Sequence, residues 1–81
     1  MEKGYVLAID QGTTSTRVLV IDSELRVVDF AFRELKQITP FPGWVEHDPE
    51  EIFETVTQCL KEVVSKHNLN KSNVKAIGIT N

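Results

Sequence analysis

The sequence predicts an α/β fold in which three short strands are followed by one helix and a fourth strand. Residues 5–10 form an apolar run whose two alternating faces are both apolar, as in a strand buried on two sides. Helix-start signals come together at residues 48–51, and apolar residues then recur at the helical interval. The order β-β-β-α-β lets the helix carry the chain back over the sheet, so we expect a mixed sheet whose last strand is parallel to the first.

The first three strands are expected at residues 5–10, 17–22 and 26–33, joined by tight turns into an antiparallel meander. Gly12 begins the first turn, where it is expected to supply backbone freedom. The third strand alternates, and its apolar side chains should point to the core and its polar ones to solvent. The expected apolar set is Val28, Phe30 and Phe32, and the expected polar set is Asp29 and Arg33.

The helix is expected to follow an irregular segment, residues 37–47, that contains several chain breakers. Asp48 can cap the helix, Pro49 suits its first position, and Glu51 lies three residues after Asp48, as in a capping box. Asn68 and Asn70 are expected to end it, before a strand at residues 74–80. The predicted apolar face consists of Ile52, Phe53, Val56, Leu60, Val63, Val64 and His67.

Composition limits the class of protein. The chain has 81 residues, one cysteine and a formal net charge of −3, which fits one globular domain. The single Cys59 excludes an internal disulfide and is expected to be a small buried side chain. There is no cluster of Lys and Arg for nucleic acid and no apolar stretch of about 20 residues for a membrane span. With no signal-peptide pattern at the N-terminus, a cytoplasmic protein is expected.

The most informative segment is the polar turn that follows the first strand. Asp10 ends that strand, and Gly12 and four consecutive hydroxyl side chains follow, at residues 13–16. Successive backbone N–H groups can bind an anion, hydroxyls can donate to phosphate oxygens, and a carboxylate can hold Mg²⁺ directly or through water. Arg17 adds a positive charge that can reach a phosphate. An ordinary polar hairpin remains the alternative, because Gly and Thr are common in turns.

The next turn provides an internal comparison. Asp22 also ends a strand, but neither Gly nor a run of hydroxyls follows it. We therefore interpret Asp22 as a turn residue that bonds to nearby backbone groups.

Three strings of residues, in order along the chain, resemble the FGGY family of carbohydrate kinases. The string Asp-Gln-Gly-Thr-Thr-Ser-Thr-Arg, residues 10–17, is similar to the first phosphate motif of the superfamily of sugar kinases, heat-shock ATPases and actin. The second is Pro-Gly-Trp-Val-Glu-His-Asp-Pro at residues 42–49, and the third is Ala-Ile-Gly-Ile-Thr-Asn at residues 76–81. Together with Gln11, they resemble most closely the branch of the family that phosphorylates glycerol.

The resemblance implies a fold and roles for individual residues. Residues 1–81 would form the N-terminal part of the first, ribonuclease-H-like lobe of a two-lobed, actin-like ATPase fold that continues beyond Asn81. The turn, including Gly12, would bind ATP. Thr13, Thr14 and Ser15 match positions that contact ATP phosphates, and Thr13 also the phosphate of the product. Arg17 matches a position that contacts ADP, and Asp10 one that helps to hold Mg²⁺.

The activity that the resemblance implies is ATP-dependent phosphorylation of glycerol to sn-glycerol 3-phosphate by a full-length protein that is expected to be a homo-oligomer. The family's catalytic base and its glycerol-binding residues would lie outside residues 1–81, so no catalytic residue is expected here. Alternatives are a kinase of the same family for another polyol or sugar such as xylulose, an assembly or chaperone ATPase of the superfamily, and a small interaction module.

The remaining candidates are assigned structural roles. Trp44 is expected to pack its loop onto the lobe, and His47 to make local hydrogen bonds. His67 is expected at the helix C-terminus, where a cation is favoured. Two histidines and one cysteine do not make a zinc site.

Overall fold

The computed structural model describes residues 4–36, 42–43 and 48–80 and confirms the predicted order of elements. The strands β1 (Tyr5–Gln11), β2 (Ser15–Asp22) and β3 (Val27–Glu34) are followed by the helix α1 (Pro49–Lys66) and the strand β4 (Val74–Thr80). The strand order in the sheet is β3-β2-β1-β4. The first three strands pair antiparallel, whereas β4 lies parallel to β1, as the sequence predicts.

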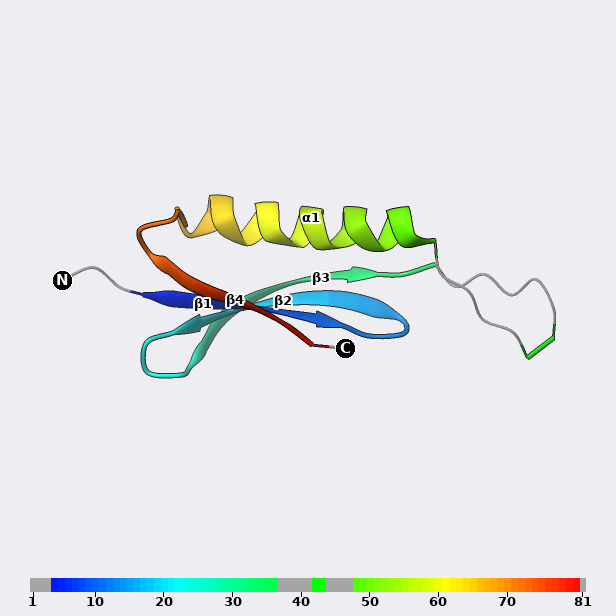
Figure 1. Ribbon diagram of the computed structural model, residues 1–81, viewed down its shortest axis with the longest axis horizontal. Helices are drawn as coiled ribbons and strands as arrows, with labels where there is room; N and C mark the ends of the chain where they lie inside the picture. Colours follow the sequence, from blue (N-terminus) through cyan, green and yellow to red (C-terminus); the bar gives the residue numbers. More distant parts are fainter. Residues whose placement is uncertain (1–3, 37–41, 44–47, 81) are drawn as a thin grey trace.

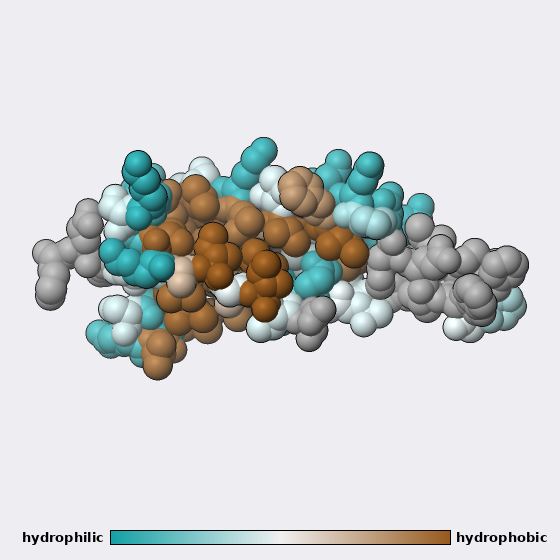
Figure 2. Space-filling model, viewed as in Figure 1, coloured by the Kyte–Doolittle hydropathy of each residue, from teal (hydrophilic) through white to brown (hydrophobic). Residues whose placement is uncertain are grey.

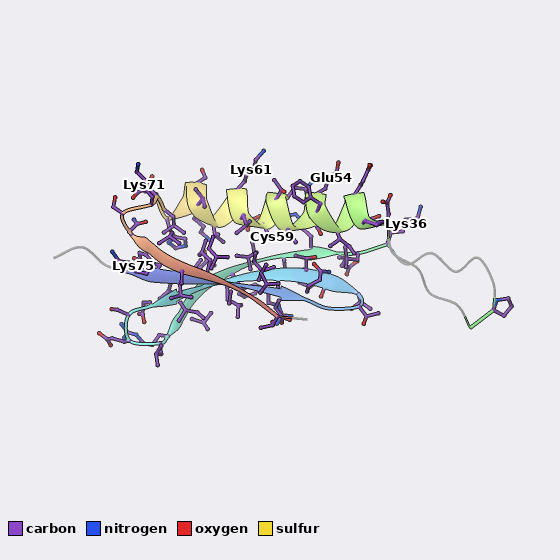
Figure 3. The ribbon with its side chains drawn as sticks, in the orientation of Figure 1. Lys36, Glu54, Cys59, Lys61, Lys71 and Lys75 are labelled. Carbon is purple, nitrogen blue, oxygen red and sulfur yellow. The ribbon has the colours of Figure 1, made fainter. Side chains whose placement is uncertain are left out.

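The core lies between α1 and the face of the sheet that the helix covers (Figure 1). β1 and β2 each contribute alternate side chains to it, because successive residues of a strand point to opposite faces, whereas β3 contributes Ala31 and β4 only the partly buried Val74. Cys59 points from α1 toward the sheet, whereas Glu54 and Lys61 point away (Figure 3). The buried apolar cluster consists of Leu7, Ile9, Val18, Val20, Ala31, Cys59, Val63 and Leu69.

Local hydrogen bonds define both ends of α1. The Asp48 side chain accepts from the Glu50 N–H at 2.9 Å, which confirms Asp48 as the N-cap. Glu51 was expected to complete a capping box, but its carboxylate accepts from the backbone N–H of Lys36 at 2.7 Å instead. The first turn of α1 is thereby tied to the chain that leaves β3.

The C-terminal end of α1 is a Schellman-type turn. Asn68 has a φ of 52°, in the left-handed region that Asn tolerates better than most residues. The N–H of Leu69 then donates to the carbonyl of Val64 at 3.0 Å, and the Leu69 side chain is buried. The helix therefore ends where the sequence predicts.

The structure corrects part of the expected face of α1 and the direction of β3. Of the expected α1 face, Val63 is buried and Val56 and Leu60 pack against the core, whereas Phe53 and Val64 are exposed. The buried stripe of α1 is Thr55, Cys59 and Val63, each four residues from the next, while Phe53 is 72% exposed. On β3 the alternation was predicted correctly but its direction was wrong, because Phe30 lies on the face away from α1 and is 55% exposed. Pattern alone cannot show which face a helix covers. Val28 and Phe32, which were expected in the core, are exposed on the same uncovered face as Phe30.

Ion pairs explain why the polar face of β3 is turned toward α1. Asp29 Oδ2 lies 2.8 Å from His67 Nε2 and 3.0 Å from Lys66 Nζ. Arg33 Nη2 lies 2.8 Å from Glu62 Oε1. The hydrogen bond from His67, followed by that from Lys66, holds the pKa of Asp29 well below its usual range. Ion pairs at the edge of the helix thus join β3 to α1, and their side chains remain partly exposed to solvent.

A second apolar region lies beside β4. Ile77 and Ile79 are exposed, and Figure 2 shows apolar side chains gathered along this side of the molecule. A hollow of about 510 Å³ runs between β4 and the C-terminal half of α1, with Leu60 and Val64 in its wall. Its lining is mostly apolar, with Asn70, Lys71 and Lys75 as its polar residues, and we assign no ligand to it. Within the residues that the structure describes, no helix is long and apolar enough to cross a membrane.

The Asp29 ion pairs predict a pH dependence of stability. Because the folded-state pKa of Asp29 is lowered, its carboxylate stabilises the fold above its unfolded pKa of about 4, and this contribution is lost as the pH falls through the lower folded-state value. Asp29→Asn should therefore reduce the free energy of unfolding at pH 5–6, and the difference from wild type should shrink below pH 4. Urea unfolding between pH 3 and 6 measures this. Glu24→Gln, on an exposed turn, is the control, and a pH-independent difference for Asp29→Asn would contradict the prediction.

Candidate functional site

The turn between β1 and β2 is held by hydrogen bonds on both sides. The antiparallel register pairs Gln11 with Thr16, and the N–H of Gly12 donates to the carbonyl of Ser15 at 2.9 Å. The carbonyl of Thr14 accepts from the N–H of Leu35 at 2.8 Å, which ties the turn to the chain after β3. The turn is thus held by its own backbone and by the chain that follows β3.

The tip of this turn presents free hydrogen-bond donors. Thr13 and Thr14 are exposed, and Ser15 is half-buried. Within the part of the chain that the structure describes, the backbone N–H groups of Thr13 and Thr14 have no acceptor. Consecutive free N–H groups beside hydroxyls are a common arrangement for binding an anion. The site can therefore offer several donors to a phosphate without rearrangement of the sheet.

A carboxylate and a guanidinium lie on the same face of the sheet beside the turn. Asp10 and Arg17 are direct cross-strand partners, so their side chains point to the face away from α1, and both are exposed. The Arg17 Cζ lies 5.9 Å from the ring centroids of both Phe30 and Phe32. This distance is within the range of a cation–π contact, which helps to hold the guanidinium over the uncovered face. Among the described residues, no ion pair joins the Asp10 carboxylate to the Arg17 guanidinium.

The fourth hydroxyl of the motif does not belong to the surface of the site. Thr16 is fully buried, and its hydroxyl bonds to Gln11 and Thr55. The sequence suggested four hydroxyls for a phosphate, but the alternation of β2 turns this one into the core. Three remain at the turn, on Thr13, Thr14 and Ser15.

The expected role of Gly12 is also corrected. Its φ lies outside the left-handed region, and a Cβ atom would meet the carbonyl oxygen of Ser15 at 3.5 Å, an ordinary contact. The backbone of the turn therefore does not require glycine at this position. Gly43, by contrast, has a φ of 82°, which favours glycine.

The interpretation of Asp22 as a turn residue is confirmed. Asp22 Oδ1 accepts from the backbone N–H groups of Glu24 and Arg26, each at 2.9 Å, and Oδ2 lies 3.0 Å from Arg26 Nε. The backbone bond from Arg26, above all, holds the pKa of Asp22 below its usual value. Asp22 is occupied by its own turn, whereas Asp10 is free to face a ligand.

Thr80, which no sequence motif marks as a site residue, lies beside the site in the structure. In the parallel register of β1 and β4, Asp10 pairs with Thr80. The end of β4 and the beginning of α1 lie at the same end of the sheet as the β1–β2 turn (Figure 1). Ligands of open α/β sheets commonly bind at the carboxyl ends of parallel strands. The parallel pairing of the first and last strands was the signal that could have identified this residue.

The described residues offer one carboxylate for a cation at this site. They contain no group of three or more His, Cys, Asp or Glu side chains that could enclose a metal ion. Mg²⁺ is often held by one or two carboxylates together with substrate phosphates and water, so Asp10 beside the turn fits that mode. Burial raises the pKa of the Cys59 thiol, which fits a structural side chain. Trp44 and His47 lie outside the described residues.

Comparison with known proteins identifies the family. Residues 5–81 match the model of the N-terminal domain of the FGGY family of carbohydrate kinases. The chain belongs to this family. The match includes the turn and all four strands, and it confirms the resemblance based on the three sequence strings.

Among its relatives are bacterial glycerol kinases. The chain is 51% identical over 78 residues to the glycerol kinase of Rhizobium meliloti, covering 96% of this chain and 16% of that protein. It is 49% identical over 80 residues to a glycerol kinase of Escherichia coli, covering 99% of this chain and 16% of that protein. The chain thus spans about a sixth of the length of these relatives.

Solved structures of kinases share the fold. Plasmodium falciparum glycerol kinase with ADP superposes with a TM-score of 0.82 at 35% identity, covering 96% of this chain and 16% of that one. A xylulose kinase from Brucella ovis superposes with a TM-score of 0.83 at 28% identity, again covering 96% and 16%. The four-stranded sheet with α1 is therefore the part of the actin-like ATPase fold that such kinases share.

The backbone geometry at the two glycines predicts opposite responses to a methyl group. Gly12→Ala should leave the free energy of unfolding unchanged or raise it by about 0.4–1 kcal/mol, because Ala restricts the unfolded chain and fits the folded one. Gly43→Ala should lower it by about 1 kcal/mol, because its φ is positive. Urea unfolding of both variants measures the difference. Destabilisation by Gly12→Ala alone would show that the turn does need glycine.

Proposed function

We propose that the chain is the N-terminal part of the first lobe of a glycerol kinase, which transfers the terminal phosphoryl group of ATP to glycerol and gives sn-glycerol 3-phosphate and ADP. The observation that carries the proposal is the turn at residues 12–15, whose free N–H groups lie beside a carboxylate and a guanidinium on one face. The identity of about 50% to glycerol kinases supports the choice of substrate.

Each residue of the turn has a role in this proposal. The N–H groups and hydroxyls of Thr13 and Thr14, with Gly12 and Ser15, bind the phosphates of ATP, and Thr13 also contacts the phosphate of the product. Arg17 contacts ADP. Such contacts hold the phosphoryl group in position, which is the main contribution of the protein in this kind of transfer.

Asp10 fits a role in holding Mg²⁺ at the phosphates. The ion, when bound, neutralises charge on the nucleotide phosphates. The exposed Asp10 carboxylate offers it an oxygen ligand, directly or through a bound water molecule. Proton removal from the glycerol hydroxyl is assigned to a carboxylate in another part of the kinase.

Another substrate of the same family is the second candidate. Gluconate kinase from Lactobacillus acidophilus superposes with a TM-score of 0.86 at 24% identity, covering 98% of this chain and 15% of that one, so the fold does not distinguish substrates. Glycerol is favoured by the higher identity to glycerol kinases. Assay of the full-length protein with ATP, Mg²⁺ and either glycerol, xylulose or gluconate tests the choice. Preferential turnover of xylulose or gluconate would replace glycerol but keep the kinase.

The proposed Mg²⁺ role of Asp10 predicts a specific defect. Asp10→Asn keeps the size of the side chain but removes the charge, so activity or Mg²⁺ affinity of the full-length kinase should fall about 10–100-fold. Because a higher Mg²⁺ concentration compensates for weaker binding, the defect should become smaller as Mg²⁺ is raised. Steady-state kinetics over a range of Mg²⁺ concentrations measures both effects.

Asp22→Asn is the matched control, because it removes the same charge from the end of the neighbouring strand. Asp22 bonds to its own turn, so this variant should lose some stability but keep kcat and its Mg²⁺ dependence. Equal kinetic defects in both variants, or a defect in Asp22→Asn alone, would contradict the assignment of the phosphate site to the β1–β2 turn.

A further inference from the structure

Two polar side chains are buried directly behind the turn. Thr16 on β2 has an exposed fraction of 0%, and Thr55 on α1 one of 7%. Their hydroxyl oxygens lie 3.0 Å apart although 39 positions separate the two residues in the sequence. A buried hydroxyl costs stability unless it is hydrogen-bonded, so each of these two hydroxyls is expected to donate to an acceptor nearby.

The number of protons decides which bonds are made. Thr16 Oγ1 lies 2.8 Å from Gln11 Oε1, and Thr55 Oγ1 lies 2.8 Å from the carbonyl oxygen of Ile52. Both of these end atoms only accept, and each hydroxyl has one proton, so three contacts share two protons. The carbonyl of Ile52 has a helical N–H partner in any case. The Oε1 of Gln11, by contrast, has Thr16 as its only donor among the described residues. We therefore assign the Thr16 proton to Gln11, which leaves Thr55 free to donate to Thr16 or to its own helix.

The bond from Thr16 fixes the orientation of the Gln11 amide. Gln11 and Thr16 are cross-strand partners, so both side chains lie on the α1 face of the sheet. With Oε1 held by Thr16, the Nε2 of Gln11 donates to the carbonyl oxygen of Gly12 at 3.2 Å. A continuous series of bonds thus leads from the core to the first residue of the turn.

The carbonyl of Gly12 shares a peptide unit with the N–H of Thr13. The described chain has no cis peptide bond, so these two groups point in opposite directions from one plane. Holding the carbonyl on the Gln11 side therefore turns the Thr13 N–H to the opposite side. This N–H is one of the free donors at the tip of the turn.

We propose that Gln11 and Thr16 are positioning residues of the site, which orient the Gly12–Thr13 peptide so that the Thr13 N–H faces the phosphate. The inference rests on the proposed function for the identity of the ligand, and on the hydrogen bonds alone for the orientation of the peptide. It also gives a role to Gln11, a residue of the motif that has no contact with ligand in the proposed mechanism.

The kinetic test uses the full-length kinase with two variants that break the series of bonds. Thr16→Val keeps the shape of the side chain and removes the donor, and Gln11→Met removes the amide. Each should raise the KM for ATP about three- to tenfold, the effect of about one hydrogen bond, and leave the KM for glycerol unchanged. The double variant should be no worse than either single variant, because both break the same series. Thr16→Ser should restore the wild-type KM.

Thr55→Val is the matched control. It removes a hydroxyl from the same buried site but leaves the bonds from Thr16 to Gln11 and from Gln11 to Gly12 intact. It should change stability without changing the KM for ATP. A rise in KM for Thr55→Val equal to that for Thr16→Val would overturn the inference, as would additive effects of Thr16→Val and Gln11→Met.

Amide hydrogen exchange gives a readout that does not depend on activity. The N–H groups of Gly12 and Leu35 bond within and to the turn, so Gln11→Met and Thr16→Val should speed their exchange about three- to tenfold relative to Thr55→Val. Equal exchange in all three variants would overturn the inference. If Thr16→Val does not fold, Gln11→Met, at a half-buried position, carries both readouts. A wild-type protein without ATP-dependent phosphorylation of glycerol would overturn the proposed function, while the exchange data would still decide the orientation of the peptide.

Discussion

The antiparallel register between β1 and β2 is the constraint on which the site depends. It pairs Asp10 with Arg17 and Gln11 with Thr16, and these neighbouring pairs point to opposite faces of the sheet. One pair lies on the uncovered face, where a ligand can reach it, and the other lies toward α1. A slip of one residue would exchange the two faces and bury the charges. Fold and site are therefore set by the same pairing.

Contacts between α1 and the buried Thr16 of β2 help to fix that register. Thr55 and Cys59 on α1 both contact Thr16, through its hydroxyl and its carbonyl oxygen respectively. The cap at Asp48 and the bond from Lys36 to Glu51 position the first turn of α1. The ion pairs of Asp29 join its other end to β3. The face of the sheet that α1 covers is thus held to the helix at several places.

Much of this could be predicted from the sequence because it is local. The order of elements, the cap at Asp48 and the end of α1 follow from residue type and periodicity. The distinction between Asp10 and Asp22 also follows, because it depends on the residues immediately after each strand. The family resemblance was confirmed over residues 5–81.

What could not be predicted depends on contacts between distant segments. The alternation of β3 is visible in the sequence, but the choice of face depends on His67 and Lys66, more than 35 residues further along the chain. The burial of Thr16 likewise depends on Thr55. The polar hydroxyl of Thr16 predicted a surface position, whereas the register of β1 and β2 places Thr16 in the core.

The most direct test is a crystal structure of the full-length protein with ADP and Mg²⁺. We expect phosphate oxygens within hydrogen-bond distance of the Thr13 and Thr14 N–H groups, on the face of the sheet that carries Asp10 and Arg17. We also expect Gln11 still to bond to the carbonyl of Gly12. Phosphates bound elsewhere, with the tip of this turn facing only solvent, would contradict the proposed site.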